Sequence, residues 1–208
     1  MQVEIYSTEE QQVDAIKQFW KDYGTSIIVG AVVGLGGLYG WNEYSDMKVT
    51  AAEEASESFQ SIVTQSANPA ALLVQAESFA SEHDQQGYQA LLELMVAKSA
   101  VEAGDLAKAE ASFTKIIAAQ PGSGLGMVAM IRLARIQAEQ NNIGMALATL
   151  DQVTDKAFAS QREELKGDFL VRQGDLDKAK SAYQAAVDNG GALASPALTM
   201  KLDNLNKA

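Results

Sequence analysis

The side chains that most often carry catalysis or bind metals are scarce in this 208-residue chain. It has no cysteine, which excludes disulfides, thiolate metal sites and cysteine nucleophiles. Its one histidine, His83, lies in the polar run SEHDQQG beside Glu82 and Asp84. A metal ion there would need further ligands from elsewhere in the chain. We therefore predict that this run is a solvated loop and that the chain has no metal site.

Pairs of adjacent carboxylates give little evidence for a catalytic site either. Glu53-Glu54 and Glu163-Glu164 are neighbours in the sequence, and neighbours on a helix point in different directions. Solvated helix faces explain such pairs more simply than general acid–base catalysis does. Glycine-rich phosphate loops follow a strand, and the sequence has no strand pattern. We predict that the chain has no catalytic residues, binds no cofactor and is not an enzyme.

Two arginines are better placed for binding chemistry. Arg132 and Arg135 lie three residues apart in the run IRLAR, so they share a face if the run is helical. Guanidinium groups bind carboxylates through paired hydrogen bonds, so these side chains could meet an acidic group or a terminal carboxylate. Ordinary solvation of an amphipathic helix explains each one equally well. The whole chain is acidic, with 16 Lys+Arg against 27 Asp+Glu, and we expect no nucleic-acid binding.

Three related segments are expected to build the element that carries these arginines. Residues 104–113 read GDLAKAEASF and residues 174–183 read GDLDKAKSAY, and the midpoint, 141–150, reads NNIGMALATL. The shared alanines, Ala109, Ala146 and Ala179, are 37 and then 33 residues apart. A period near 34 with this pattern is typical of tetratricopeptide repeats, which are pairs of antiparallel helices.

The repeated residue types suit that fold. Gly104 and Gly174 fit a left-handed turn between the two helices of a pair, and Asp105 and Asp175 can cap the second helix. The shared alanines allow the paired helices to cross closely. Aromatic or leucine side chains are expected to fill the space towards the next helix, and a proline ends the second helix of the first copy; these are Phe113, Leu150, Tyr183 and Pro121.

The pattern predicts an all-α domain with stated boundaries. First helices of the pairs are expected over 89–103, 127–140 and 161–173, and second helices over 106–119, 143–153 and 176–189. Two helices over 44–64 and 70–81 precede them, and one over 196–206 caps the stack. Stacked pairs form a concave surface lined mainly by first helices. The candidate partner contacts on it are Leu94, Met95, Lys98, Ile131, Arg132, Arg135, Leu165 and Asp168.

The stretch before the repeats has the pattern of a transmembrane helix. Twenty consecutive residues, 23–42, carry no charge, which suits a span of roughly 30 Å. Aromatic residues flank it, as expected at the two membrane interfaces: Phe19, Trp20 and Tyr23 before, and Tyr39, Trp41 and Tyr44 after. A buried core helix lacks such belts. A cleaved signal peptide would have a basic start and a small-residue cleavage site, which this sequence does not show.

Glycines within the span form two pairs four residues apart, Gly30 with Gly34 and Gly36 with Gly40. Each pair shares a helix face on which another transmembrane helix could pack, although small residues are also simply common in such spans. Lys17 and Lys21 precede the span and only Lys48 follows closely, which places the N-terminus in the cytoplasm. The run EEQQVDAIKQFWKDYG should form a short amphipathic helix at the inner surface.

The predicted organisation is therefore a cytoplasmic amphipathic segment over 1–22, a single transmembrane helix over 23–42 and a periplasmic tetratricopeptide-like repeat domain over 43–208. The family resemblance set out next implies the inner membrane of a bacterium as the location, with one span.

The N-terminal block EEQQVDAIKQFWKDYGTSIIVGAVVGLGGLYGW, followed by a repeat domain of this length, resembles the YfgM-like family, and the resemblance covers essentially the whole chain. Members are ancillary subunits of the bacterial Sec translocon with one span and a periplasmic tetratricopeptide-like domain. The resemblance implies three partners: translocon subunits, a membrane-anchored periplasmic chaperone of the prolyl-isomerase type, and exported unfolded polypeptides. It implies no catalytic motif.

We thus expect a membrane-anchored interaction protein that links exported polypeptides to periplasmic chaperones. The alternative is a tetratricopeptide scaffold for envelope assembly or cell division, which would bind one folded partner and no unfolded clients.

Overall fold

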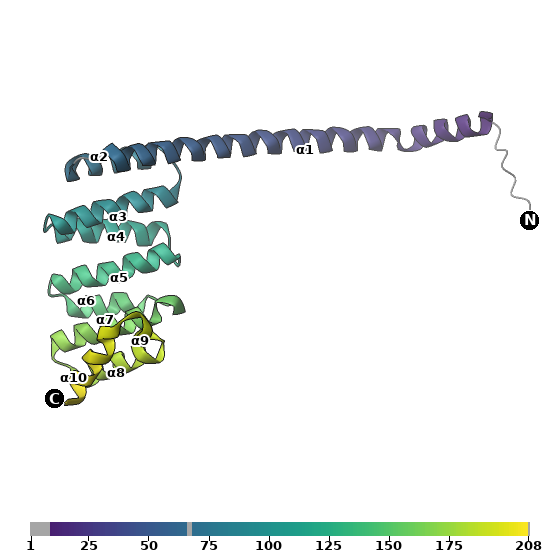
Figure 1. The fold of residues 1–208 in the computed structure, drawn as a ribbon. Helices are drawn as coiled ribbons and strands as arrows, with labels where there is room; N and C mark the ends of the chain where they lie inside the picture. The colour runs from purple at the N-terminus through teal and green to yellow at the C-terminus, as the bar shows by residue number, and fades with distance from the viewer. Residues whose placement is uncertain (1–8, 66–67, 208) are drawn as a thin grey trace, which may run out of the picture. The chain divides into compact units, whose positions relative to one another are not determined.

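The computed structural model describes residues 9–65 and 68–207, and the first eight residues of the predicted cytoplasmic segment lie outside them. The described residues form helices joined by short loops, with no strand among them (Figure 1). The prediction of an all-α fold is therefore confirmed. The helices are α1 (Glu9–Gln65), α2 (Pro69–Glu82), α3 (Gln86–Glu102), α4 (Leu106–Ala119), α5 (Gly124–Glu139), α6 (Ile143–Asp151), a 3-10 turn (Lys156–Phe158), α7 (Ala159–Gln173), α8 (Leu176–Asp188), α9 (Gly191–Ala194) and α10 (Pro196–Lys207).

Helix α1 joins three stretches that the sequence pattern separates. It contains the end of the amphipathic segment, the predicted span and the helix expected over 44–64. No proline lies between Glu9 and Gln65, so nothing interrupts the ladder of backbone hydrogen bonds. The amphipathic residues therefore continue into the span and do not form a separate short helix. Contacts between Cα atoms divide the chain into two compact units, one ending at Glu54 and the other beginning at Ala55.

The three predicted helix pairs are α3–α4, α5–α6 and α7–α8, and each helix packs on the next one along the chain (Figure 1). The turn between the helices of a pair has the same construction in all three. Its left-handed residue is Gly104, Asn141 or Gly174, with φ of 77°, 63° and 85°. Asparagine is the side chain that best tolerates this region, which explains how the middle copy keeps the turn without glycine.

In two of the three pairs, the residue that follows the left-handed position caps the second helix. The carboxylates of Asp105 and Asp175 accept hydrogen bonds from the backbone N–H groups of Lys108 and Lys178, at 3.0 and 3.3 Å. Asn142 occupies the same position in the middle pair, but its side chain makes no capping bond. The predicted caps are thus confirmed in the first and third repeats.

The core follows the repeat pattern. Ala109, Ala146 and Ala179 are fully buried, as expected where two helices cross closely. The side chains that follow them by four residues are buried as well, with Phe113 at 4%, Leu150 at 0% and Tyr183 at 3% exposure. The apolar clusters run continuously from one pair to the next: Leu133 and Ile136 pack with the first pair, whereas Ile131 and Ala134 pack with the third.

Each end of the stack is covered by a further helix. At one end, Ala55 and Ile62 of α1 form a cluster with α2 and α3, in which Phe59 stacks on Tyr88 at 4.9 Å between ring centroids. At the other end, Leu198 of α10 is fully buried against Tyr183 and Ala186, and Leu202 and Leu205 pack beside it. The predicted capping role of the last helix is therefore confirmed, because it hides the apolar face of α8.

Candidate partner-binding surface

The first helices of the three pairs, α3, α5 and α7, together line an open hollow of about 510 Å³. Its apolar part comes from Val101 on α3, Phe113 on α4, Ile136 on α5 and Phe169 on α7. Its charged part comes from Lys98, Glu102, Arg132, Arg135 and Glu139. We call this hollow the apolar groove. It lies on the helices that the repeat pattern assigns to the concave side, and it includes Lys98, Arg132 and Arg135 from the predicted contacts.

The arginines of the chain differ in their surroundings. Arg162 donates to the backbone oxygen of Val153 at 2.6 Å, and Arg172 donates to that of Ala138 at 2.8 Å. Both also form an ion pair with a glutamate at 2.8–2.9 Å. Arg132 and Arg135 are exposed, and within residues 9–65 and 68–207 neither forms a hydrogen bond or ion pair. The two arginines of the apolar groove are therefore available to an external acceptor.

The acidic side chains of the apolar groove are already paired. Glu139 accepts from Arg172 at 2.9 Å, and Glu102 lies 3.7 Å from Lys98. These contacts offset the two negative charges, so the local excess of charge is the pair of guanidinium groups. An acidic chain thus presents a small positive site at this place.

A second hollow, of similar volume, adjoins the first, and Arg135 lines both. We call it the polar hollow. It is bordered by Ser160, Gln161, Glu164 and Asp168 of α7, and by Ser195 and Lys201 next to or on α10. The two hollows together make a surface that continues from the middle of the stack to its C-terminal end.

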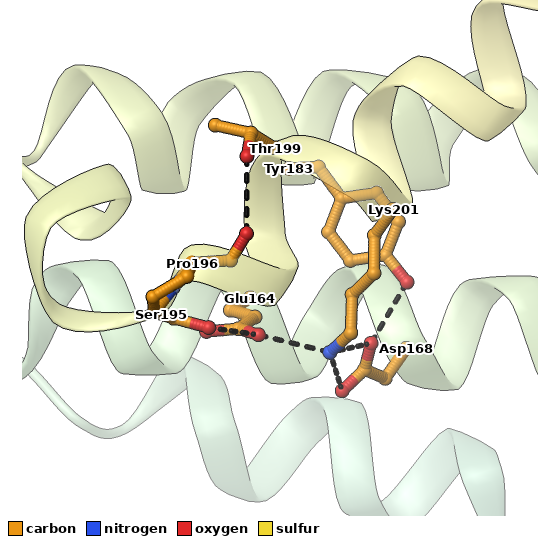
Figure 2. A network of polar contacts seen from close by, with 7 residues as sticks. All are labelled: Glu164, Asp168, Tyr183, Ser195, Pro196, Thr199 and Lys201. Atoms are coloured by element: carbon orange, nitrogen blue, oxygen red, sulfur yellow. Dashed lines mark hydrogen bonds and ion pairs between the residues drawn. The ribbon is translucent and has the colours of Figure 1, made fainter.

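Lys201 links Glu164 and Asp168, two residues that border the polar hollow, and Figure 2 shows these contacts. Its Nζ donates to Glu164 at 2.9 Å and lies 2.7 Å from Asp168 Oδ1. Tyr183 donates to the same Oδ1 at 2.8 Å, and Ser195 donates to Glu164 at 3.0 Å. The network ties α10 to α7 and α8, and it accounts for both carboxylates without an external partner.

The pKa values of the network follow from this arrangement. Burial raises the pKa of Tyr183 far above its usual value, and the hydrogen bond to Asp168 and the nearby negative charges raise it further. Burial lowers the pKa of Lys201, but the hydrogen bonds and charges of Asp168 and Glu164 outweigh that effect and raise it overall. Tyr183 therefore stays protonated and Lys201 stays charged at neutral pH.

The other predicted contacts lie elsewhere. Ile131 is a core residue, 3% exposed, and borders neither hollow, whereas Leu165 is a core residue, 7% exposed, that borders the polar hollow. Leu94 and Met95 are half-buried and pack against two different apolar clusters. Asp168 faces the polar hollow but is bonded to Tyr183 and Lys201. Of the predicted contacts, Lys98, Arg132 and Arg135 border the apolar groove, and Arg135, Leu165 and Asp168 border the polar hollow. Their contact with a partner remains a prediction. The apolar groove also includes residues that the sequence pattern did not select.

Those additional residues are the apolar ones, Val101, Phe113, Ile136 and Phe169. Ile136 could have been found, because it lies four residues after Arg132 and so on the same helix face. Phe113 and Phe169 are core side chains, each 4% exposed, whose edges border the apolar groove. Whether a core side chain also borders the groove depends on how neighbouring helices pack, and a single sequence does not reveal that packing.

Helix α1 contains the only stretch, among residues the structure describes, that is long and apolar enough to cross a membrane. A Cβ atom added at Gly30, Gly34, Gly36 or Gly40 would meet no atom within 4 Å outside the adjacent backbone of its own helix. The faces that carry these glycines are therefore open, and their use in helix packing remains a prediction. In the same described ranges, no cluster of three metal-binding side chains occurs.

Comparison with known proteins agrees with this architecture. A model of the "Tetratricopeptide repeat-like domain" family matches residues 17–207. Among solved structures, MamA from Desulfovibrio magneticus RS-1 superposes with a TM-score of 0.56 and 19% identity, covering 75% of this chain and 84% of that one. The N-terminal domain of stress-induced protein-1 from C. elegans gives 0.51 and 16%, covering 59% and 98%. At such low identity these two structures support the fold alone.

Two full-length relatives carry the same name. A protein of Escherichia coli called "Ancillary SecYEG translocon subunit" is 34% identical over 209 residues, which is 98% of this chain and all of that protein. A protein of the same name from Aggregatibacter actinomycetemcomitans is 32% identical, over 95% of this chain and 97% of its own length. The chain therefore belongs to the tetratricopeptide repeat-like family in which these ancillary translocon subunits are found.

Proposed function

We propose that the chain is a single-span membrane protein of the SecYEG translocon, and that its repeat domain links exported polypeptides to periplasmic chaperones. The observation that carries the proposal is the match over nearly the full length to proteins named as ancillary subunits of that translocon. The match includes the apolar stretch of α1 as well as the repeats.

The structure supports the two parts of this function separately. Apolar side chains of α1 such as Val32, Val33 and Leu38 are exposed by 66–69%, which suits contact with lipid or with another transmembrane helix. The apolar groove, with its unpaired arginines, suits a polypeptide partner. A prolyl-isomerase-type chaperone and an unfolded exported chain are the two partners that we assign to the repeat domain.

The orientation is part of the proposal. Two lysines, Lys17 and Lys21, precede the apolar stretch and Lys48 follows it, so the positive-inside tendency favours a cytoplasmic N-terminus. The repeat domain is then periplasmic.

Site-specific photo-crosslinking in living cells tests the proposal. A photoreactive residue at position 33 or 38 of the span should capture translocon subunits. The same residue at position 132 or 135 should capture a periplasmic chaperone or an exported chain during export. Position 180 on α8 is the matched control, because Lys180 is exposed but belongs to a second helix and borders neither hollow.

The outcomes separate the two functions considered from the sequence. Capture of translocon subunits from the span and of chaperones or exported chains from the groove supports the proposal. Capture only of proteins of envelope assembly or cell division, from both regions, would overturn it in favour of a scaffold without unfolded clients.

A further inference from the structure

The apolar groove combines two kinds of recognition within one hollow. We propose that it binds an interior stretch of a partner polypeptide in which a bulky apolar side chain neighbours a side-chain carboxylate. The inference rests on the proposed function, since it specifies the chemistry of the polypeptide that the repeat domain holds.

The apolar half of this recognition comes from four helices. Phe113, Ile136 and Phe169 are at most 6% exposed, so each is fixed by the core and shows one edge to the groove. Val101 is 41% exposed and adds an apolar wall. The volume of about 510 Å³ falls within the roughly 300–1,000 Å³ typical of ligand pockets. The groove is thus large enough for a bulky apolar side chain, and its rigid floor needs no rearrangement to accept one.

The preference for a carboxylate follows from the charged residues that border the apolar groove. Glu102 and Glu139 are each paired with a cation of this chain, at 3.7 and 2.9 Å. Arg132 and Arg135 are on the same face of α5, and neither has an ionic or hydrogen-bonding partner in the part of the chain that the structure describes. A carboxylate entering here meets two guanidinium groups and no unpaired acid. Arginine forks match carboxylates in geometry as well as charge, so an acidic partner is favoured over a neutral or basic one.

The continuity of the surface favours an interior stretch over a chain end. Arg135 borders both hollows, so a polypeptide can pass from the apolar groove into the polar hollow. There, Lys201 forms ion pairs with both Glu164 and Asp168 and offsets one of their two negative charges, while Arg135 borders the same hollow. The apolar groove is an open hollow, whereas a pocket that holds a terminal carboxylate would have to end around it.

Binding of fluorescent peptides to the full-length protein in detergent micelles tests the inference. The probe is a short, acetylated and amidated peptide with a phenylalanine next to two glutamates in a glycine–serine background. Matched peptides replace the glutamates by glutamine or by lysine, or the phenylalanine by alanine. Fluorescence anisotropy should give the tightest binding for the intact probe, and its affinity should fall as salt is added.

The protein variants assign the effect to the two arginines. We expect Arg132→Gln and Arg135→Gln each to weaken binding of the acidic probe by about tenfold, and the glutamine peptide by much less, because a charge-assisted contact is lost only with the acidic probe. Lys180→Gln removes the same charge from an exposed site on α8 and should leave both affinities unchanged. Circular dichroism checks that all variants retain their helix content.

Several results would overturn the inference. One is equal binding of the acidic, neutral and basic peptides; another is unchanged affinity in Arg132→Gln and Arg135→Gln. A third is no saturable binding up to about 1 mM peptide. Tight binding only of a peptide with a free C-terminal carboxylate would assign the groove to chain ends. A change in the sedimented mass of the arginine variants, without any change in peptide affinity, would assign it to a second copy of the chain.

Failure of this inference leaves the proposed function separately testable. Crosslinks from positions 33 and 38 to translocon subunits do not depend on the groove, so their presence with no peptide selectivity rejects only the partner chemistry. Their absence rejects the proposed function itself.

Discussion

Gly167 of α7 lies where its helix meets the ring of Tyr183 on α8. A Cβ atom at this position would overlap the ring, well inside van der Waals contact. The ring cannot simply turn aside, because Tyr183 is 3% exposed and its hydroxyl donates to Asp168. The glycine is therefore required by close packing between two helices.

The change Gly167→Ala should lower the free energy of unfolding by roughly 1–3 kcal/mol, the usual cost of overpacking a tight interface. Thermal unfolding of the full-length protein in detergent, followed by circular dichroism, measures it. Gly144→Ala is the control: Gly144 is also helical, but no atom lies within 4 Å of an added Cβ, and alanine should stabilise by up to about 1 kcal/mol. Equal effects of the two changes would contradict the close approach at Gly167.

Tyr183 also makes stability depend on alkaline pH. Its pKa in the folded chain is raised above the ordinary value of 10.0, so the folded state holds the proton more tightly than the unfolded state. This contribution is fully present below pH 10 and is lost as pH rises through the folded pKa. Lys201, raised from 10.5, acts in the same direction.

Stability should therefore decline progressively from about pH 10 upwards, and more steeply in the unaltered chain than in Tyr183→Phe, which lacks the titrating hydroxyl. At pH 7 the same change should cost about 1 kcal/mol for the lost hydrogen bond. Unfolding followed between neutral and strongly alkaline pH measures both quantities. Identical alkaline slopes in the two proteins would show that Tyr183 does not contribute.

At the scale of helices, the second helix of each pair depends on its first residues. Asp105 satisfies the N–H of Lys108 at the start of α4, whereas Asn142 makes no such bond at the start of α6. Asp105→Ala should lower the free energy of unfolding by about 1 kcal/mol. Asn142→Ala, at the matching place in the middle repeat, should change it by less than about 0.5 kcal/mol. Thermal unfolding measures both, and a larger loss at Asn142 would refute the capping argument.

The starts of the second helices were predictable, whereas the first helices begin two or three residues before the predicted positions 89, 127 and 161, at Gln86, Gly124 and Ala159. The second helices begin at Leu106, Ile143 and Leu176, as the sequence pattern indicates, because the turn and capping residues before them act locally. The predicted end of the middle one, at Val153, was too late by two residues, since α6 ends at Asp151. Helix α9 was missed because its four residues carry no periodic pattern.

Packing was less predictable than helix position. Ile131 belongs to a helix face that repeat periodicity alone assigns to the concave side, yet it is 3% exposed because α5 is covered by neighbours on two sides. Arg132, the next residue, is exposed. A shift of one residue along a helix turns a side chain by about a quarter of a turn, so small errors in phase move residues between core and surface. The exposure of Arg132 and Arg135 could be predicted without knowing that phase, because charged side chains are rarely fully buried.

At the scale of the whole molecule, the 57-residue helix α1 contains the residues that we propose anchor the chain to a membrane. The middle of its uncharged stretch, Val32 and Val33, is 66% and 69% exposed, so these side chains have no protein core to bury them. In the proposed transmembrane span, lipid or other helices within lipid would surround these side chains. An arginine at the centre of such a span costs roughly 2.5–3.5 kcal/mol in membrane insertion.

We therefore expect the double change Val32→Arg and Val33→Arg to move a large part of the protein out of the membrane fraction, because two charged residues cost roughly 5–7 kcal/mol at the bilayer centre. The control is Met47→Arg with Val49→Arg, which places the same charges on exposed positions of α1 beyond the uncharged stretch and should leave the protein in the membrane. Carbonate extraction followed by ultracentrifugation measures the distribution. Equal retention of both variants would mean that residues 23–42 do not anchor the chain, and a membrane role for the repeat domain would then need another attachment.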